Sequence, residues 1–196
     1  MDLIQLVTTH FVDSIAAKQE SMEVLSAPIA AAAEHLLACL MNEGKIMACG
    51  NGGSAADAQH FAAEMVGRFE KERPGLAALS LATDTSALTA IGNDYDFDMI
   101  FSKQVRALGQ TGDVLLAIST SGNSTNVIEA IHSAHERQMT VIALTGKDGG
   151  RIGDILSSED ILLNVPVQRT ARIQEVHILI IHALCDAIDY MLLGGD

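Results

Sequence analysis

The sequence predicts an α/β fold in which a five-stranded parallel sheet lies between two layers of helices, a three-layer α/β/α arrangement. Two observations lead to this prediction. Short apolar segments recur from residue 45 onward, and each is followed by small or polar residues that suit a turn. Between them lie stretches of helical length with apolar residues on one face. Strands that alternate with helices form parallel sheets covered on both faces, and such sheets bind ligands beyond the carboxyl ends of their strands.

Residues 3–42 precede the first strand and are predicted to form a pair of helices. A break is expected near Ala27-Pro28, because proline cannot donate a backbone hydrogen bond inside a helix. This pair carries few chemical groups, so its role is packing, either on the core or on another subunit. We interpret residues 1–196 as a single domain, and we favour a role for residues 1–42 in oligomerisation. Apolar residues at helical spacing are Leu3, Leu6, Val7, Phe11, Ile15 and Ala16, then Leu36, Leu37, Leu40 and Met41.

The alternating part of the chain begins at Lys45, and the turn at Arg73-Pro74-Gly75 does not divide it into domains. The candidate strands are Lys45–Cys49, Ala77–Leu81, Val114–Ile118, Thr140–Leu144 and Ile161–Val165. The candidate helices between them are Ala55–Phe69, Ser86–Ile91, Met99–Leu108 and Asn126–Gln138, and a last helix runs from about Ala171 to Leu193.

Composition limits the partners and the location of the protein. The chain has 196 residues, 48% of them apolar, which suits one globular domain with a sizeable core. Its formal charge of -13 argues against nucleic acid or an anionic membrane as partner. Cys39, Cys49 and Cys185 are far apart and odd in number, as expected of reduced thiols in a cytosolic protein. We expect a cytoplasmic protein, since neither an export signal nor an apolar run of about 18 residues is evident.

The first strand is followed by a glycine turn that predicts an anion site. Asn51-Gly52-Gly53 lets the backbone turn tightly, because glycine adopts positive φ without steric cost. Ser54 is a good N-cap, and the alanines after it favour a helix. Unpaired N–H groups and the positive end of the helix dipole then point above the strand, where phosphate is the most frequent ligand.

His60 and Glu64 lie four residues apart on the helix after this turn, so they share a face. A lone helical histidine is more often structural than a ligand, and a helical glutamate is usually solvated. Here both follow a predicted phosphate loop at the functional edge of the sheet. This position favours a functional imidazole beside a carboxylate, about two helical turns from the phosphate.

A second loop follows the strand Val114–Ile118 and resembles the first. An ordinary N-cap and turn would account for one or two of its hydroxyl residues, whereas four in six positions favour phosphate binding. The first loop also fits a loose Gly-x-Gly-x-x-Ala dinucleotide pattern, but the acidic residue needed at the end of the second strand comes late, at Asp84. A nucleotide cofactor is therefore disfavoured. The four hydroxyl residues are Ser119, Thr120, Ser121 and Ser124.

The last helix carries Gln174 and His182, eight residues apart, roughly 12 Å along a helix and about 80° round it. Their side chains could just converge on one point or act in different subunits, and the spacing leaves both open. His182 follows four apolar residues and is expected to be buried or at an interface; His177 is interpreted as structural. Asn93-Asp94 is placed in a loop, where a turn is the plain interpretation and a ligand contact is possible.

Five motifs together resemble the sugar isomerase (SIS) domain family over nearly the whole chain, and within it the branch that acts on sedoheptulose 7-phosphate. The resemblance implies a homotetramer of five-stranded, flavodoxin-like α/β/α subunits. It also implies isomerisation to D-glycero-D-manno-heptose 7-phosphate through an enediol, the first step toward the ADP-heptose precursor of lipopolysaccharide core. The motifs are Gly50–Ala55, His60–Glu64, Ser119–Ser124, Thr145–Gly150 and Arg172–His182.

The same resemblance implies one zinc ion per subunit and a set of substrate contacts. Some members carry Asp three residues before the motif glutamine, where this chain has Ala171, so a role for that acid is not carried over. The implied zinc ligands are His60, Glu64, Gln174 and His182. Sugar-phosphate contacts are implied for Asn51, Gly52, Gly53, Asn93, Asp94, Ser119, Thr120, Ser121 and Ser124, and we expect Ser54, Glu64 and Gln174 to join them.

The mechanism expected of such a site is proton transfer. Glu64 is assigned as the base that removes the C1 proton of the open-chain ketose, and His182 as the general acid at the sugar oxygens. Zinc would polarise the carbonyl and stabilise the developing oxyanion. Coordination lowers the basicity of a carboxylate, so Glu64 would have to leave the metal during turnover.

Two other functions are considered. A non-enzymatic branch of the family, whose members bind a replication initiator, resembles this chain in Arg172-Ile173-Gln174-Glu175 and around Cys185-Asp186. In that branch the positions of Glu64 and His182 hold other residues, so the acid–base pair here favours the enzyme. A sugar-phosphate sensor of the same fold ranks last, because such sensors usually carry a DNA-binding domain for which the chain has no room.

Overall fold

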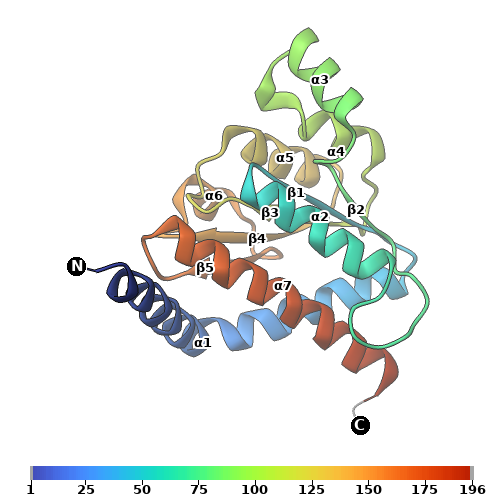
Figure 1. The fold of residues 1–196 in the computed structure, drawn as a ribbon. Coiled ribbons are helices and arrows are strands. Elements are labelled where there is room, and N and C mark those ends of the chain that lie inside the picture. Colours follow the sequence, from blue (N-terminus) through green and yellow to red (C-terminus); the bar gives the residue numbers. More distant parts are fainter. Residues whose placement is uncertain (1, 195–196) are drawn as a thin grey trace.

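The structure, a computed structural model, describes residues 2–194 and contains one five-stranded sheet in which every pair of neighbouring strands is parallel. The strand order is β2-β1-β3-β4-β5 (Figure 1). The predicted parallel sheet is thus confirmed, with shifts of one or two residues at some strand ends. The strands are β1 (Ile46–Gly50), β2 (Ala78–Ser80), β3 (Val114–Ile118), β4 (Thr140–Gly146) and β5 (Ile161–Val165).

Helices cover both faces of the sheet, as the alternation of strands and helices predicts. Alternate strand residues point to opposite faces, so Ala48 and Leu116 pack in one core cluster while Met47 and Leu115 pack in the other. The first cluster lies under α1 (Leu3–Met41), α2 (Gly53–Val66) and α7 (Thr170–Leu193). The second lies under α4 (Ser102–Leu108), α5 (Thr125–Glu136) and α6 (Gly150–Ile155).

The N-terminal segment forms one long helix, so the prediction of two helices with a break near Ala27-Pro28 is wrong. Pro28 lies inside α1. The missing backbone bond at a proline permits a bend, and Figure 1 shows that α1 changes direction along its length. The helix continues because Leu25 before the proline and Ala32, Ala33 and Leu36 after it are all buried. Burial on both sides outweighs one lost hydrogen bond.

Several other helix limits differ from the sequence prediction, and the cause is local turn chemistry. Helix α6 was not expected, since six residues are too few to show a helical period; it begins where Gly149 and Gly150 both have positive φ. Helix α4 starts only at Ser102, because the Asp96 side chain accepts a bond from the N–H of Asp98 and opens a separate 3₁₀ turn, η1 (Phe97–Met99). Helix α2 ends at Val66, three residues earlier than predicted.

Helix α3 (Thr85–Asp94) stands away from the rest of the subunit (Figure 1) and buries none of its residues. The side chain of Asp84 caps it by accepting a bond from the N–H of Ala87 at 2.9 Å. This cap lets the helix start at Thr85, one residue before the predicted Ser86, and at its other end the helix runs three residues past the predicted Ile91. Asn93 and Asp94 therefore belong to its last turn, which corrects their predicted place in a loop.

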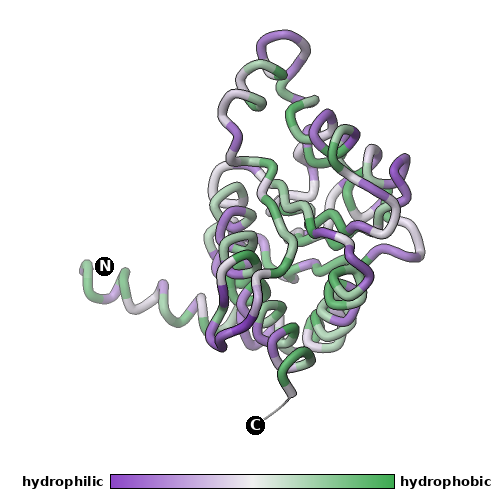
Figure 2. Tube along the Cα trace, turned by 90° about the vertical axis from the view of Figure 1, so that its right-hand side faces the viewer, coloured by the Kyte–Doolittle hydropathy of each residue, from purple (hydrophilic) through white to green (hydrophobic). Residues whose placement is uncertain are grey.

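Two helices, α1 and α7, are long and apolar enough by length and composition to cross a membrane. Neither helix contains an uninterrupted apolar run of about 18 residues, so no such segment was expected from the sequence. Core helices of soluble proteins pass the same test, and α7 packs its buried side chains against α1, α2 and the sheet. Figure 2 shows apolar and polar residues alternating along these helices. Packing inside the subunit accounts for the composition of α7, whereas the N-terminal part of α1 leaves Leu3, Phe11 and other apolar side chains exposed.

His177 is structural, as predicted, and its burial makes stability depend on pH. The imidazole is fully buried on α7, and its Nε2–H donates to the carbonyl of Thr145 at 2.9 Å. Burial lowers the pKa of His177 to about 4, with the Thr145 bond opposing the shift. The unfolded chain takes up this proton near its usual pKa of about 6.5, whereas the folded chain does not. Folding stability should therefore fall by about 3 kcal/mol as the pH drops from 6.5 to 4.

Urea denaturation at neutral pH and near pH 4.5 measures this loss. A His177→Gln variant keeps a donor for Thr145 but no titrating ring, so its stability should change less between the two pH values than that of the wild-type chain. Equal pH dependence of the two proteins would contradict the assignment.

Candidate active site

The first loop closes through its own backbone. Gly52 has φ +57° and caps α2, with its carbonyl accepting the N–H groups of Ala55 and Ala56 at 3.1 and 3.2 Å. The prediction of Ser54 as the N-cap is wrong, because it lies within the first turn and is buried. A Cβ on Gly50 would meet the Cβ of Ser54 at 2.7 Å. Ser54 thus packs beneath the loop, and its own N–H donates to the carbonyl of Asn51 at 3.0 Å, so the turn is closed by backbone bonds.

The second loop follows β3 and presents its hydroxyls in a compact group. Ser119 is buried, and its Oγ lies 3.0 Å from the Oγ of Ser124. The Ser121 Oγ accepts the N–H of Asn123 at 3.2 Å. Gly122 turns the loop with φ +65° and donates its N–H to the carbonyl of Ser119 at 3.0 Å. Hydroxyls and a helix N-terminus so arranged suit a phosphate without a cationic side chain.

A pair of amides ties the two loops together. Asn51 and Asn126 bond reciprocally through their side chains, with both N–O distances at 2.8 Å. Strands β1 and β3 are neighbours in the sheet, so the predicted phosphate loops meet at one edge. Asn126 was not singled out in the sequence, where a polar residue in the first turn of a helix gives no distinctive signal.

The loop after β4 braces the second loop from behind. The N–H of Ile152 donates to the carbonyl of Gly122 at 2.9 Å, and the N–H of Arg151 donates to the Oδ1 of Asn123 at 3.1 Å. A Cβ on Gly122 would run into the carbonyl of Gly149. These contacts give a structural reason for the glycine-rich motif Thr145–Gly150.

Helices α2 and α7 bring two histidines and a glutamate together beside these loops. The Nε2 atoms of His60 and His182 lie 3.0 Å apart, so the contact requires a proton on one of them. Glu64 Oε1 lies 3.4 Å from His60 Nε2, with the two side chains 23% and 41% exposed. The ring of Phe69 stands beside His182, with centroids 5.6 Å apart. His182 is half-buried, and the cluster can exchange protons with a ligand and with solvent.

Gln174 faces α2 from the same helix as His182 but contacts a different turn. A Cβ on Gly53 would overlap the amide of Gln174, so that amide lies over the first turn of α2. His60 is seven residues further, roughly 10 Å along the helix. Of the four predicted zinc ligands, the structure brings His60, Glu64 and His182 together and places the Gln174 amide beside the phosphate loop.

Asp57 is a site residue that the sequence analysis missed. It lies three residues before His60, and its buried Oδ2 has no hydrogen-bond partner among residues 2–194. Burial raises the pKa of Asp57, and the nearby His60 partly offsets this. The spacing of Gly53, Asp57, His60 and Glu64, which places all four on one stripe of α2, is the signal that could have revealed it.

A cavity of about 170 Å³ opens beside the first loop. Its polar wall comes from Gly50, Asn51 and Gly52, and its apolar wall includes Leu88, Phe97 and Phe101. Asn93 and Asp94, which were predicted to contact substrate, lie on α3, both exposed and bonded to each other at 2.8 Å. The carbon chain of a small phosphorylated ligand could enter this cavity while its phosphate reaches the loops.

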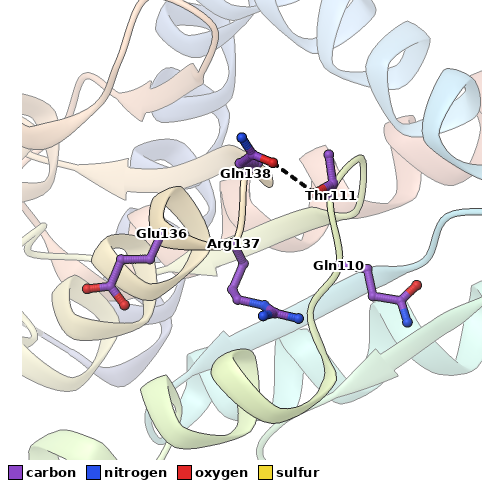
Figure 3. A pocket seen from close by; sticks show the side chains of 5 residues that line it. All are labelled: Gln110, Thr111, Glu136, Arg137 and Gln138. Atoms are coloured by element: carbon purple, nitrogen blue, oxygen red, sulfur yellow. Dashed lines mark hydrogen bonds between the residues drawn. The ribbon is translucent and has the colours of Figure 1, made fainter.

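Figure 3 shows a larger hollow, of about 470 Å³, at the amino ends of β3 and β4. Gln110, Thr111, Glu136, Arg137 and Gln138 line it. Its polar groups are partly occupied, since Thr111 donates to Gln138 at 3.1 Å and Arg137 donates to the carbonyl of Gly109 at 2.9 Å. It lies at the opposite edge of the sheet from the loops and is separate from the site.

The side chains of His60, Glu64, Gln174 and His182 are of the kinds that bind zinc, but in the structure they do not all lie together. Imidazole nitrogen and carboxylate oxygen are preferred zinc ligands, and two imidazoles on one tetrahedral ion lie about 3.3 Å apart. His60 and His182 already meet at 3.0 Å. Within residues 2–194, however, no three His, Cys, Asp or Glu side chains surround a common point as a metal cage. The residues fit the ion chemically, and the Gln174 amide, which lies over Gly53, stands apart from the other three donors.

Comparison with known proteins agrees with this site. A family model described as SIS domain matches residues 10–146. A phosphoheptose isomerase from Laribacter hongkongensis is 80% identical over 196 residues, all of both chains. Solved structures of phosphoheptose isomerases from Neisseria gonorrhoeae and Francisella tularensis superpose with TM-scores of 0.92 and 0.94, at 66% and 46% identity, each covering 96% of this chain and 99% of the other.

The chain therefore belongs to the SIS domain family. Its similarity to phosphoheptose isomerases extends over the full length, which places it in that branch of the family. The resemblance predicted from the sequence motifs is confirmed. The alternative of a non-enzymatic module that binds a replication initiator gains no support from these relatives.

Proposed function

We propose that the chain is an aldose–ketose isomerase that converts sedoheptulose 7-phosphate to D-glycero-D-manno-heptose 7-phosphate, the first step toward ADP-heptose. One observation carries the chemistry: a contact between His60 and His182, with Glu64 beside it, next to two phosphate-type loops. Isomerisation through an enediol needs a base and an acid close to one carbon pair, and a separate anchor for the phosphate. The names of the full-length relatives support the seven-carbon substrate.

The phosphate is anchored by the two loops. Hydroxyls of Ser119, Thr120, Ser121 and Ser124 and the N–H groups at the start of α5 would surround it. Asn51, Gly52 and Gly53 form the other loop, which ends at the start of α2. Ser54 is buried and supports this loop from below rather than contacting substrate directly.

Proton transfer is assigned to Glu64 and His182. The carboxylate of Glu64 removes the C1 proton of the open-chain ketose, because it is partly exposed and held beside an imidazole. His182 supplies and accepts protons at the sugar oxygens. His60 lies against His182, with 3.0 Å between their Nε2 atoms, and limits how far its ring can turn.

His60, Glu64, Gln174 and His182 would hold one zinc ion per subunit. When bound, zinc polarises the carbonyl and stabilises negative charge on its oxygen. The Gln174 amide lies over Gly53, roughly 10 Å along α2 from His60, so it would have to leave Gly53 to serve as the fourth ligand.

Metal removal tests this proposal. Purified protein should convert sedoheptulose 7-phosphate, lose most of its activity in chelator, and regain it with added zinc, because the oxyanion would otherwise lack its strongest stabilising charge. The measurement is turnover before and after chelation, with magnesium as the control ion. If the chelator leaves the activity unchanged, the chain is still an isomerase, but zinc has no part in its mechanism.

We also infer that residues 1–42 assemble the chain into a homotetramer. The predicted apolar stripe of α1 remains exposed within one subunit, with Leu3 at 78% and Phe11 at 68%. A patch of this kind usually marks an interface. Changing Leu3 and Phe11 to Glu should convert the tetramer to smaller species in light scattering, and an unchanged mass would contradict the inference.

We infer a cytoplasmic location as well. Cys39, Cys49 and Cys185 are free and buried. Unpaired cysteines suit a reducing compartment, where a sugar-phosphate substrate is also found.

A further inference from the structure

Arg73 lies in the segment between α2 and β2, where the sequence predicts only a turn. Its side chain is 1% exposed. The guanidinium donates through Nε to Asp189 Oδ1 at 2.5 Å, through Nη1 to the carbonyl of Met65 at 2.9 Å and through Nη2 to the carbonyl of Glu64 at 2.9 Å. A further, longer bond reaches the carbonyl of Pro74 at 3.3 Å. One buried side chain therefore binds the end of one helix and a carboxylate of another.

These acceptors belong to the two helices that build the proton-transfer cluster. Glu64 and Met65 lie in the last turn of α2, and Asp189 lies on α7. Asp189 follows His182 by seven residues, about two helical turns, so both point to nearly the same side of α7. The Arg73–Asp189 ion pair thus lies on the side of α7 that carries His182, the residue that contacts His60.

The chemistry of the pair favours a positional role over a purely stabilising one. The side chain of Asp189 is 2% exposed, and within the described part of the chain its second oxygen has no hydrogen-bond partner. Buried ion pairs often contribute little more stability than well-packed apolar residues would. The planar guanidinium, in contrast, fixes the directions of several bonds at once. Such a group can set the distance between two helices.

We propose that Arg73, held by Asp189, is a positioning residue that keeps Glu64 on α2 in register with His182 on α7. The inference rests on the proposed isomerase function. The backbone carbonyl of Glu64 is itself a bond acceptor of Arg73, so loss of the bridge would shift the base directly. A displacement of about 1 Å at a reacting group can cost roughly 100-fold in rate.

Arg73→Lys tests the proposal. Lysine keeps the positive charge, but its single ammonium group cannot reach the carbonyls of Glu64 and Met65 and the carboxylate of Asp189 at once. We expect kcat to fall about 10- to 100-fold while KM for the sugar phosphate stays within about twofold. Binding of inorganic phosphate should be unchanged, since the loops lie at the other end of α2. Arg106→Lys is the matched control, because Arg106 forms an exposed pair with Glu136 at 3.1 Å.

Asp189→Asn and Arg73→Ala separate positioning from folding. Asp189→Asn keeps the size of the side chain and should lower kcat as Arg73→Lys does. The measurement is made at temperatures at which circular dichroism shows that the variant is folded. Added guanidinium should partly restore kcat to Arg73→Ala, whereas sodium at equal ionic strength should not. Folded Arg73→Lys and Asp189→Asn variants with kcat within about twofold of wild type would overturn the proposal, as would a parallel rise in KM.

Hydrogen exchange distinguishes failure of this inference from failure of the proposed function. Wild-type protein without any turnover would contradict the isomerase. In that case, amides in the last turn of α2 should still exchange faster in Arg73→Lys than in Arg106→Lys if Arg73 holds this turn. Equal exchange in the two variants would show that it does not.

Discussion

Gly122→Ala should destabilise the protein by about 3 kcal/mol and abolish phosphate binding. Two effects add at this position. The residue has φ +65°, where an L side chain is strained, and the new Cβ would run into the carbonyl of Gly149 and lie 2.9 Å from the N of Gly150. These are backbone atoms, so no side-chain rotation relieves the overlap. The second loop would have to leave its bracing contact with Ile152.

Gly112→Ala is the matched control. Gly112 also has positive φ, at +88°, but no atom lies within 4 Å of its added Cβ. It lies in the turn before β3, outside the site. This variant should lose only about 1 kcal/mol and keep its affinity for phosphate. Thermal denaturation and binding of inorganic phosphate measure both quantities. Equal losses in the two variants would show that the contact with Gly149 does not hold the loop.

Glu64→Gln should lower kcat by about 10²- to 10⁴-fold and leave KM nearly unchanged. The amide preserves the shape of the side chain but cannot accept the C1 proton. Substrate affinity comes mainly from the two phosphate loops, which this change does not touch. Steady-state kinetics with sedoheptulose 7-phosphate gives both parameters.

Glu136→Gln provides the control for this substitution. Glu136 is exposed and pairs with Arg106 at the opposite edge of the sheet, so the variant should turn over at the wild-type rate. Near-normal kcat in Glu64→Gln would exclude Glu64 as the base and direct attention to Asp57, the buried carboxyl on the same stripe of α2.

Much of the fold follows from patterns that are local in sequence. The five strands are predicted because each is a short apolar run followed by a turn, and their parallel arrangement follows from the helices between them. The long α1 is different. Pro28 is a local signal for a break, but burial of Leu25 and Leu36 on either side of it is a tertiary effect that no local pattern contains.

The candidate site also combines features that are local in the sequence with contacts between distant residues. The glycine turn and the serine-rich loop are predictable, because strand-end glycines and clustered hydroxyls have few other uses. The meeting of His60 with His182 joins residues 122 positions apart, and helical spacing left the partner of His182 open. The N-cap was predicted two residues too late, at Ser54, because Gly52, with positive φ, closes the loop through its carbonyl. Arg73 and Asn126 were missed because the side chains that they bond, Asp189 and Asn51, are far away in the sequence.

We propose that this chain interconverts a ketose phosphate and an aldose phosphate through proton transfer. The most direct test follows sedoheptulose 7-phosphate by NMR in D₂O with purified wild-type protein and zinc. The account predicts that the heptose 7-phosphate aldose forms and that deuterium enters at C2, because the enediol is protonated there by groups that exchange with solvent. A folded, zinc-supplied protein that leaves the ketose unchanged would contradict it.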